Sequence, residues 1–136
     1  MIIFLSCVAK KNDHPCCARE MYWPSTWFKS AYLYAASQKP NAIYILSAKY
    51  GLLVPDTIIK PYQKTLCDQS DFELRRWAIM VTEQIRIKNI DLNEKAIFLC
   101  GINYRKYIKR LFSDYEEPVA HLGIGSQVKY FKEHTS

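Results

Sequence analysis

The stretch ILSAKYGLLVPD, residues 45–56, starts as a buried β-strand and ends as a loop. Its apolar residues up to Ser47 form the continuous run that is typical of an interior strand in a parallel sheet. Lys49 follows almost at once, and Gly51 and Pro55 then interrupt the extended pattern. A lysine placed directly after a buried strand indicates that the strand ends carry functional groups.

Strand-like and helix-like segments alternate along the rest of the chain. We expect further strands at residues 2–5, 95–100 and 118–122, and helices at residues 25–38, 70–88, 103–112 and from 126 onward. Together with the strand at residues 42–47, these elements predict a single α/β domain of three layers. Its centre is a four-stranded, mainly parallel sheet between two layers of helices. In such sheets, ligands bind beyond the carboxyl ends of the strands.

The composition fits a globular protein with an anionic partner. Of the 136 residues, 49% are hydrophobic and 24% are charged, which is ordinary for a folded domain. The formal net charge of +6 favours a polyanion such as a nucleic acid, although many basic small proteins bind none. No apolar run approaches the ~20 residues of a membrane span, and the segment MIIFLSC lacks the features of a secretory signal. We therefore expect a cytoplasmic protein without membrane contact.

Neither a metal nor a cofactor is expected. The five cysteines are an odd number, so reduced thiols are predicted. Cys16 and Cys17 are adjacent, and with His14 they match no common zinc spacing. The segment LGIGSQ, residues 122–127, lacks the third glycine of the dinucleotide fingerprint, and the chain has no G-K-[ST] sequence.

Lys10, Lys11 and Lys49 follow two of the expected strands and are predicted to meet at one edge of the sheet. There they would hold phosphate groups, helped by backbone N–H groups after Gly101 and Gly125. Alternatively, each lysine is simply solvated in its loop. Three cations at the strand ends favour the phosphate site.

Other candidates at this edge are the small polar residues that end the strands. Ser6, Cys7 and Ser47 would contact a substrate. Cys7 lies where a nucleophile could sit, but no histidine partner is recognisable, so a small buried residue is the simpler interpretation. Gln127 would either bind a base edge or cap the last helix.

The remaining candidates lie in loops before helices or strands. Arg19 and Tyr22, in the segment AREMYW, would clamp phosphate and stack on a base, or else pack at the entry to the first helix. Asp56 is the only acid in the long loop before Asp68, and a carboxylate near a sugar can orient water or stabilise an oxocarbenium-like charge. A turn-forming role after Pro55 is the alternative, and the spacing by itself favours it.

Several segments together resemble a small bacterial and phage family of domains of unknown function: SCVAKKND, AREMYW, LSAKYGLLVPD with IKPYQKTL, CGINYRKYI and HLGIGSQVKYFKEH. The resemblance spans nearly the whole chain. That family is in turn distantly similar to the uracil-DNA glycosylase fold, including the related domain of archaeosine-type tRNA-modifying enzymes. The resemblance adds weight to Asp56, Lys49 and Tyr62 as catalytic residues, and to Gln127 as a substrate-binding residue. The chain lacks the G-Q-D-P-Y motif and the His-Pro-Ser-Pro-like loop of uracil-DNA glycosylases, which argues against uracil as the substrate.

These observations predict an enzyme that cleaves the N-glycosidic bond of a modified base in DNA. The nucleotide would be flipped out of the stack into a hollow at the strand ends. RNA or a free nucleotide is an alternative substrate, and no obligate protein partner is evident. The family setting implies a part in defence or counter-defence between bacteria and phages. Two alternatives stay open: a non-catalytic nucleotide- or nucleic-acid-binding module, and an interaction protein whose charge only favours solubility.

Overall fold

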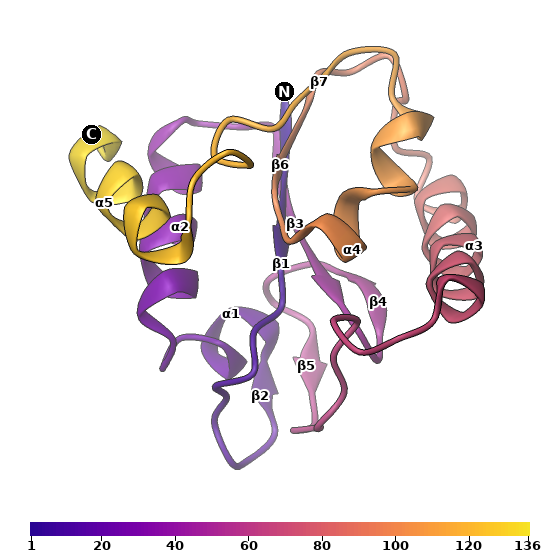
Figure 1. Ribbon diagram of the computed structural model, residues 1–136, viewed down its shortest axis with the longest axis horizontal. Coiled ribbons are helices and arrows are strands. Elements are labelled where there is room, and N and C mark those ends of the chain that lie inside the picture. Colours follow the sequence, from indigo (N-terminus) through magenta and orange to yellow (C-terminus); the bar gives the residue numbers. More distant parts are fainter.

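A five-stranded mixed sheet forms the centre of the computed structural model, which describes all 136 residues (Figure 1). In spatial order its strands are β4 (Gly51–Leu53), β3 (Ala42–Ser47), β1 (Ile2–Ser6), β6 (Ala96–Leu99) and β7 (Tyr115–Glu116). The strands β3, β1, β6 and β7 run parallel, whereas β4 is antiparallel to β3. The predicted α/β class with a mainly parallel sheet is therefore confirmed.

Helices cover both faces of this sheet. They are α1 (Ala18–Met21), α2 (Thr26–Ser37), α3 (Asp71–Ile87), α4 (Ile102–Arg105), the 3-10 helix η1 (Ile108–Leu111) and α5 (Ile124–His134). In Figure 1, α2 and α5 lie on one side of the sheet, and α3 and α4 lie on the other. A separate two-stranded antiparallel sheet is formed by β2 (Cys16–Cys17) and β5 (Ile58–Ile59). None of the helices combines the length and the apolar character needed to cross a membrane.

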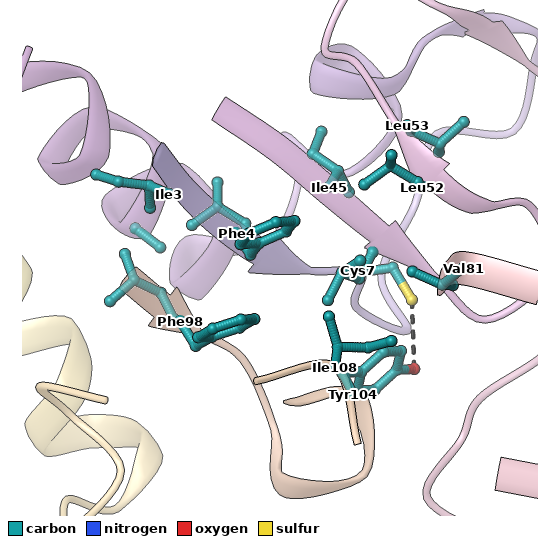
Figure 2. Packing of buried hydrophobic residues seen from close by; sticks show 14 of the residues in the cluster. Ile3, Phe4, Cys7, Ile45, Leu52, Leu53, Val81, Phe98, Tyr104 and Ile108 are labelled. Atoms are coloured by element: carbon teal, nitrogen blue, oxygen red, sulfur yellow. Dashed lines mark hydrogen bonds between the residues drawn. The ribbon is translucent and has the colours of Figure 1, made fainter. Parts of the chain in front are cut away.

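The core is built around β1, in which every residue is buried. A strand with neighbours on both edges and helices on both faces needs such an uninterrupted apolar sequence. Phe4 stacks on Phe98 of β6 with the ring centroids 4.9 Å apart (Figure 2). Burying one side chain of this size stabilises the fold by about 1.5–3 kcal/mol. The register pairs Leu5 with Ile45 and with Leu99, so β1, β3 and β6 end at one common edge of the sheet.

Serine caps start the two longest helices. The Ser25 hydroxyl accepts a hydrogen bond from Phe28 N at 3.1 Å, and the Ser70 hydroxyl accepts one from Glu73 N at 3.2 Å. Each cap satisfies a backbone donor that has no partner within the helix. The residues of α3 that pack on the sheet recur at helical spacing. They are Leu74, Trp77, Ala78, Val81 and Ile85.

The predicted strand at residues 118–122 is wrong. Pro118 has no N–H to donate to a ladder, and the chain turns, with Leu122 N donating to Val119 O at 3.0 Å. The strand that pairs with β6 lies slightly earlier, at Tyr115–Glu116.

The predicted helix at residues 103–112 is also only partly right. It is divided into α4 and η1, with turns at Lys106 and Tyr107 between them. The last helix begins at Ile124, two residues before the predicted start.

The opening stretch, residues 45–56, forms a strand that the sequence did not predict. After Ser47 the chain reverses, and Gly51 adopts a φ of +76°, which side chains other than glycine rarely tolerate. Gln84 of α3 then fixes the returning strand β4: its amide donates to Tyr50 O at 3.0 Å and accepts from Leu52 N at 2.7 Å. A Cβ at Gly51 would collide with the Gln84 Oε1 atom that makes this bond.

The direction of β4 decides where the following residues lie. Because β4 is antiparallel to β3, with Leu53 opposite Ile45, the chain moves away from the carboxyl ends of the parallel strands. Val54 and Pro55 reach the side chains of Ile43 and Tyr44, near the start of β3. The turn that contains Asp56 therefore leaves the edge at which β1, β3 and β6 end.

Candidate functional site

A cleft of about 500 Å³ opens beyond the carboxyl ends of β1 and β6. This is where an open parallel sheet places its ligands, and the volume is typical of small-molecule sites. Most of its lining side chains are apolar, and none is an aspartate, glutamate or histidine. Four of the predicted site residues line it: Ser6, Cys7, Gly101 and Gln127.

Cys7 follows β1 directly and is 7% exposed. Its thiol donates to the Tyr104 hydroxyl at 3.3 Å, as Figure 2 shows, and its sulfur accepts from Ala48 N at 3.4 Å. The buried thiol at the end of β1 therefore contacts one residue of α4 and one residue that directly follows β3. These contacts join three strand ends at the base of the cleft.

Tyr104 connects α4 to the loop at residues 64–67. Its hydroxyl accepts from Leu66 N at 3.3 Å, and the neighbouring Asn103 amide donates to Leu66 O at 2.9 Å. Burial, followed by the proximity of the Cys7 sulfur, raises the pKa of the Tyr104 phenol. Tyr104 therefore stays neutral and can exchange donor and acceptor roles with the thiol.

Gln127 forms one wall of the cleft with Trp27. Its Oε1 accepts from the Trp27 indole N–H at 2.8 Å, and its Nε2 donates to Val119 O at 3.1 Å and Leu122 O at 2.9 Å. The oxygen and both N–H groups of this amide therefore form hydrogen bonds within the protein. These contacts join α5 to Trp27 and to the preceding turn, so they favour a structural role over binding of a base edge. The predicted helix cap is not formed, because Gly123 is the N-cap of α5 and no side chain bonds there.

Arg105 lines the opposite wall and is held by Glu117. The guanidinium pairs with Glu117 through Nε and donates from Nη1 to Cys100 O at 3.0 Å, while Lys109 Nζ lies 2.8 Å from Glu117 Oε1. Burial alone would raise the pKa of the Glu117 carboxyl, but the bonds from Lys109 and Arg105 leave it below the ordinary value. Arg105 is thus a positioned cation whose charge is largely balanced within the wall.

Behind the cleft lies a cluster of hydroxyl groups. The Tyr62 hydroxyl is 2.6 Å from that of Tyr22 and 2.8 Å from that of Ser47. Burial, then the negative charge that Cys7 would carry, raises the pKa of the Tyr62 phenol. Three predicted site residues are thus brought together beside Cys7, although they do not line the cleft itself.

Lysines from separate loops lie in the cleft and in two depressions that adjoin it. Lys64 lines the cleft and two adjoining depressions, of which one contains Lys11 and the other contains Lys49. Lys11 Nζ lies 4.6 Å from the centroid of the Tyr62 ring, and burial lowers the pKa of its ammonium. None of the three lysines takes part in a salt bridge. We call Lys11, Lys49 and Lys64 the rim lysines.

Asp56 and Arg19 lie away from the cleft. The Asp56 side chain is 87% exposed, and its carboxylate is 3.5 Å from Arg19 Nη1. Backbone bonds from Ala18 N to Thr57 O and from Arg19 N to Pro55 O fix this turn against α1. The antiparallel course of β4 is the physical reason why Asp56 does not join the other predicted site residues.

Two further predicted residues also do not line the cleft. Lys10 is exposed in the loop after β1, and no salt bridge holds it. Gly125 lies in the first turn of α5 between the cleft residues Ile124 and Gln127.

Sequence reasoning missed several cleft residues: Trp27, Lys64, Cys100, Tyr104 and Arg105. Cys100, Tyr104 and Arg105 fall in the segment CGINYRKYI, at or just after the end of the predicted strand at residues 95–100. Their position at this strand end could therefore have identified them. Trp27 reaches the cleft through packing of α2 against α5, which no local pattern encodes.

The fold and site define an α/β domain with an apolar, lysine-rimmed cleft at the carboxyl edge of its sheet. The chain belongs to DUF6884, a family of unknown function whose model matches residues 2–133. The predicted membership of a domain family of unknown function is thereby confirmed. No curated protein and no solved structure matches the chain. The likeness to uracil-DNA glycosylases stays a prediction.

Proposed function

We propose that the protein binds a nucleic acid and takes one nucleoside into the cleft at the ends of β1 and β6. The observation that supports this most strongly is the combination of two features. The first is an apolar cleft with an aromatic wall at Trp27, and the second is a rim of three lysines without acidic partners.

The shape and the lining of the cleft suit a base better than a charged metabolite. A flipped base brings a flat, largely apolar surface that aromatic and aliphatic side chains accept. Val8, Trp27 and Ile124 offer such a surface, while Thr65 offers a hydroxyl. The cleft itself contains no carboxylate, whereas Glu73 and Asp68 line the adjoining depressions that hold Lys49 and Lys11.

The rim lysines suit the flanking phosphates. Each lysine comes from a different loop, and Lys64 adjoins both of the others through shared depressions. Ammonium groups that form no salt bridge can pair with phosphates without breaking an existing ion pair. Such contacts release condensed counterions, so they produce affinity that depends on salt.

Fluorescence anisotropy with labelled DNA tests this proposal. The probes are a single strand, a paired duplex and the same duplex with a central mismatch, each titrated between 50 and 300 mM salt. We expect the mismatched duplex to bind more tightly than the paired one, because less energy is needed to extrude its base. Lys64→Ala should reduce the slope of log K against log salt by about one.

Two variants complete the experiment. Lys132→Ala is the matched control, since Lys132 lies in a separate depression beside α2 and should leave the slope unchanged. Ala120→Trp fills the cleft from an exposed position and should abolish the preference for the mismatch while retaining the salt dependence. Affinity that does not change with salt, or a Lys64→Ala slope equal to the wild-type slope, would overturn the proposal.

Cleavage of an N-glycosidic bond is a second candidate. It is supported by the contact of Cys7 with Tyr104 and by the Tyr22, Tyr62 and Ser47 hydroxyls beside it. Of these groups, Cys7 and Tyr104 line the cleft and can contact a departing base, whereas the three hydroxyls lie behind them. The position of Asp56 outside the cleft counts against direct assistance by that carboxylate.

The glycosylase candidate has its own test. Purified protein is incubated with DNAs that carry different modified bases, and abasic sites are detected by alkaline strand breakage. Breakage that survives in Asp56→Asn but is lost in the cleft-filling variant Ala120→Trp would support cleavage in the cleft, with a role in phage defence or counter-defence. Absence of breakage on every DNA would leave nucleic-acid binding as the function.

A further inference from the structure

Helix α3 carries an apolar stripe on the side that faces away from the sheet. Phe72, Ile79 and Ile87 are 69%, 70% and 71% exposed, and Met80 beside them is 36% exposed. In Figure 1, α3 lies at the outer edge of the molecule on its side of the sheet. Its N-terminal half, at Phe72 and Arg76, also lines the depression that holds Lys49. Single exposed apolar residues are normal, whereas several along one helix mark an interaction surface.

The stripe follows helical geometry. Residues 72, 76, 79, 83 and 87 are spaced by three or four positions, so they lie on one face of the helix. This face is opposite to the one formed by Leu74, Trp77, Val81 and Ile85, which packs into the core. The α3 stripe, as we name Phe72, Arg76, Ile79, Glu83 and Ile87, is therefore a second amphipathic face and not part of the core.

The α3 stripe is self-complementary when one copy is reversed. It reads apolar, positive, apolar, negative, apolar along the helix. Against an antiparallel copy, Phe72 faces Ile87, and Arg76 faces Glu83. A parallel copy would instead place Arg76 against Arg76, which is repulsive.

The surroundings of Arg76 and Glu83 within one molecule are consistent with this antiparallel pairing. Arg76 forms no salt bridge, and its guanidinium lies 5.9 Å from the Phe72 ring centroid. Glu83 pairs only with Arg86 in the same helix, and both side chains are exposed. Arg76 and Glu83 can therefore form ion pairs with a second molecule without breaking a buried interaction.

We infer that two copies of the protein associate through an antiparallel, two-fold contact between their α3 stripes. Ile79 lies next to the two-fold axis, and Arg76 and Glu83 of each copy form two equivalent ion pairs around it. The helix of 17 residues gives a contact about 25 Å long. A contact of one helix pair is small for a stable dimer, so we expect a dissociation constant in the micromolar range.

Sedimentation velocity of the full chain without nucleic acid tests the inference, from roughly 1 to 200 μM, the range over which a micromolar dimer dissociates. Wild type should shift from monomer to dimer over this range. Ile79→Glu should weaken association by roughly a hundredfold, because it buries two carboxylates at the axis. Leu33→Glu is the matched control on α2, exposed but outside the stripe, and should leave association unchanged.

A charge-reversal exchange tests the antiparallel register. Arg76→Glu and Glu83→Arg should each weaken self-association roughly tenfold, because each places like charges together. An equimolar mixture of the two variants should form a heterodimer, since every pair is then opposite in charge again. Two results would overturn the inference: a wild type that stays monomeric at 200 μM, or a mixture that associates no better than its components.

Discussion

The cleft at the ends of β1 and β6 and the turn between β4 and β5 are two regions to which the sequence assigns chemistry. The cleft is concave, mainly apolar and free of carboxylates, whereas the turn is exposed and holds Asp56 in an ion pair with Arg19. Only a few residues of chain separate Ser47, at the first region, from Asp56, at the second. The comparison teaches that the direction of one short edge strand, β4, decides which residues share a site.

The largest expected effect concerns the glycine that starts β4. Gly51→Ala should lower the free energy of unfolding by about 2–3 kcal/mol, because it strains a left-handed backbone and displaces Gln84. Urea denaturation measures it. Gly125→Ala is the control, since a Cβ there meets no neighbouring atom. Equal stabilities of the two variants would show that β4 does not depend on this geometry.

A smaller effect is expected from the hydroxyl cluster that lies between the two regions. Tyr62→Phe should cost about 1–2 kcal/mol, because the hydroxyls of Tyr22 and Ser47 lose a buried partner. Thermal unfolding followed by circular dichroism measures this loss. Tyr50→Phe removes a more exposed hydroxyl that bonds only to the backbone of Lys60 at 3.3 Å, and should cost less. The reverse order would contradict the assigned network.

The pH dependence of stability tests the ion pairs of Glu117 with Arg105 and Lys109 at the wall of the cleft. The pKa of Glu117 is lower in the folded chain than in the unfolded chain, where it is about 4.3, so its contribution is present above that pH. It should be lost as the pH falls through the folded-state value. Glu117→Gln should cost about 1 kcal/mol at pH 7 and flatten stability between pH 5 and 3. A variant curve parallel to the wild-type curve would exclude Glu117 from this linkage.

The smallest effect is expected in the turn. Asp56→Asn removes one partner of an exposed ion pair, whose contribution is about 0–1 kcal/mol. Stability and DNA affinity should both stay within error of wild type. Loss of DNA affinity in this variant, with stability retained, would show that Asp56 contributes to the functional site.

Much of the fold could be predicted because it depends on local patterns. The apolar runs of β1, β3 and β6 and the helices α2 and α3 were visible in the sequence and are confirmed. β4 and β7 are only three and two residues long, and they form through pairing with neighbours rather than through their own composition. Local patterns carry little information about such strands.

The site was less predictable for the same reason. Cys7, Ser6 and Gly101 follow central parallel strands, so their shared edge could be deduced. Asp56 and Gln127 could not be assigned in this way. The position of Asp56 depends on the reversal at Gly51, and the role of Gln127 depends on tertiary contacts with Trp27 and Val119.

Chemical-shift mapping of the isotope-labelled protein with a short single-stranded DNA tests directly which of the two regions binds. The account predicts that the indole N–H of Trp27 and the amides of Thr65 and Gly101 shift on titration, and that those of Asp56 and Thr57 do not. Shifts confined to the Asp56 turn, with the Trp27 indole unmoved, would contradict it.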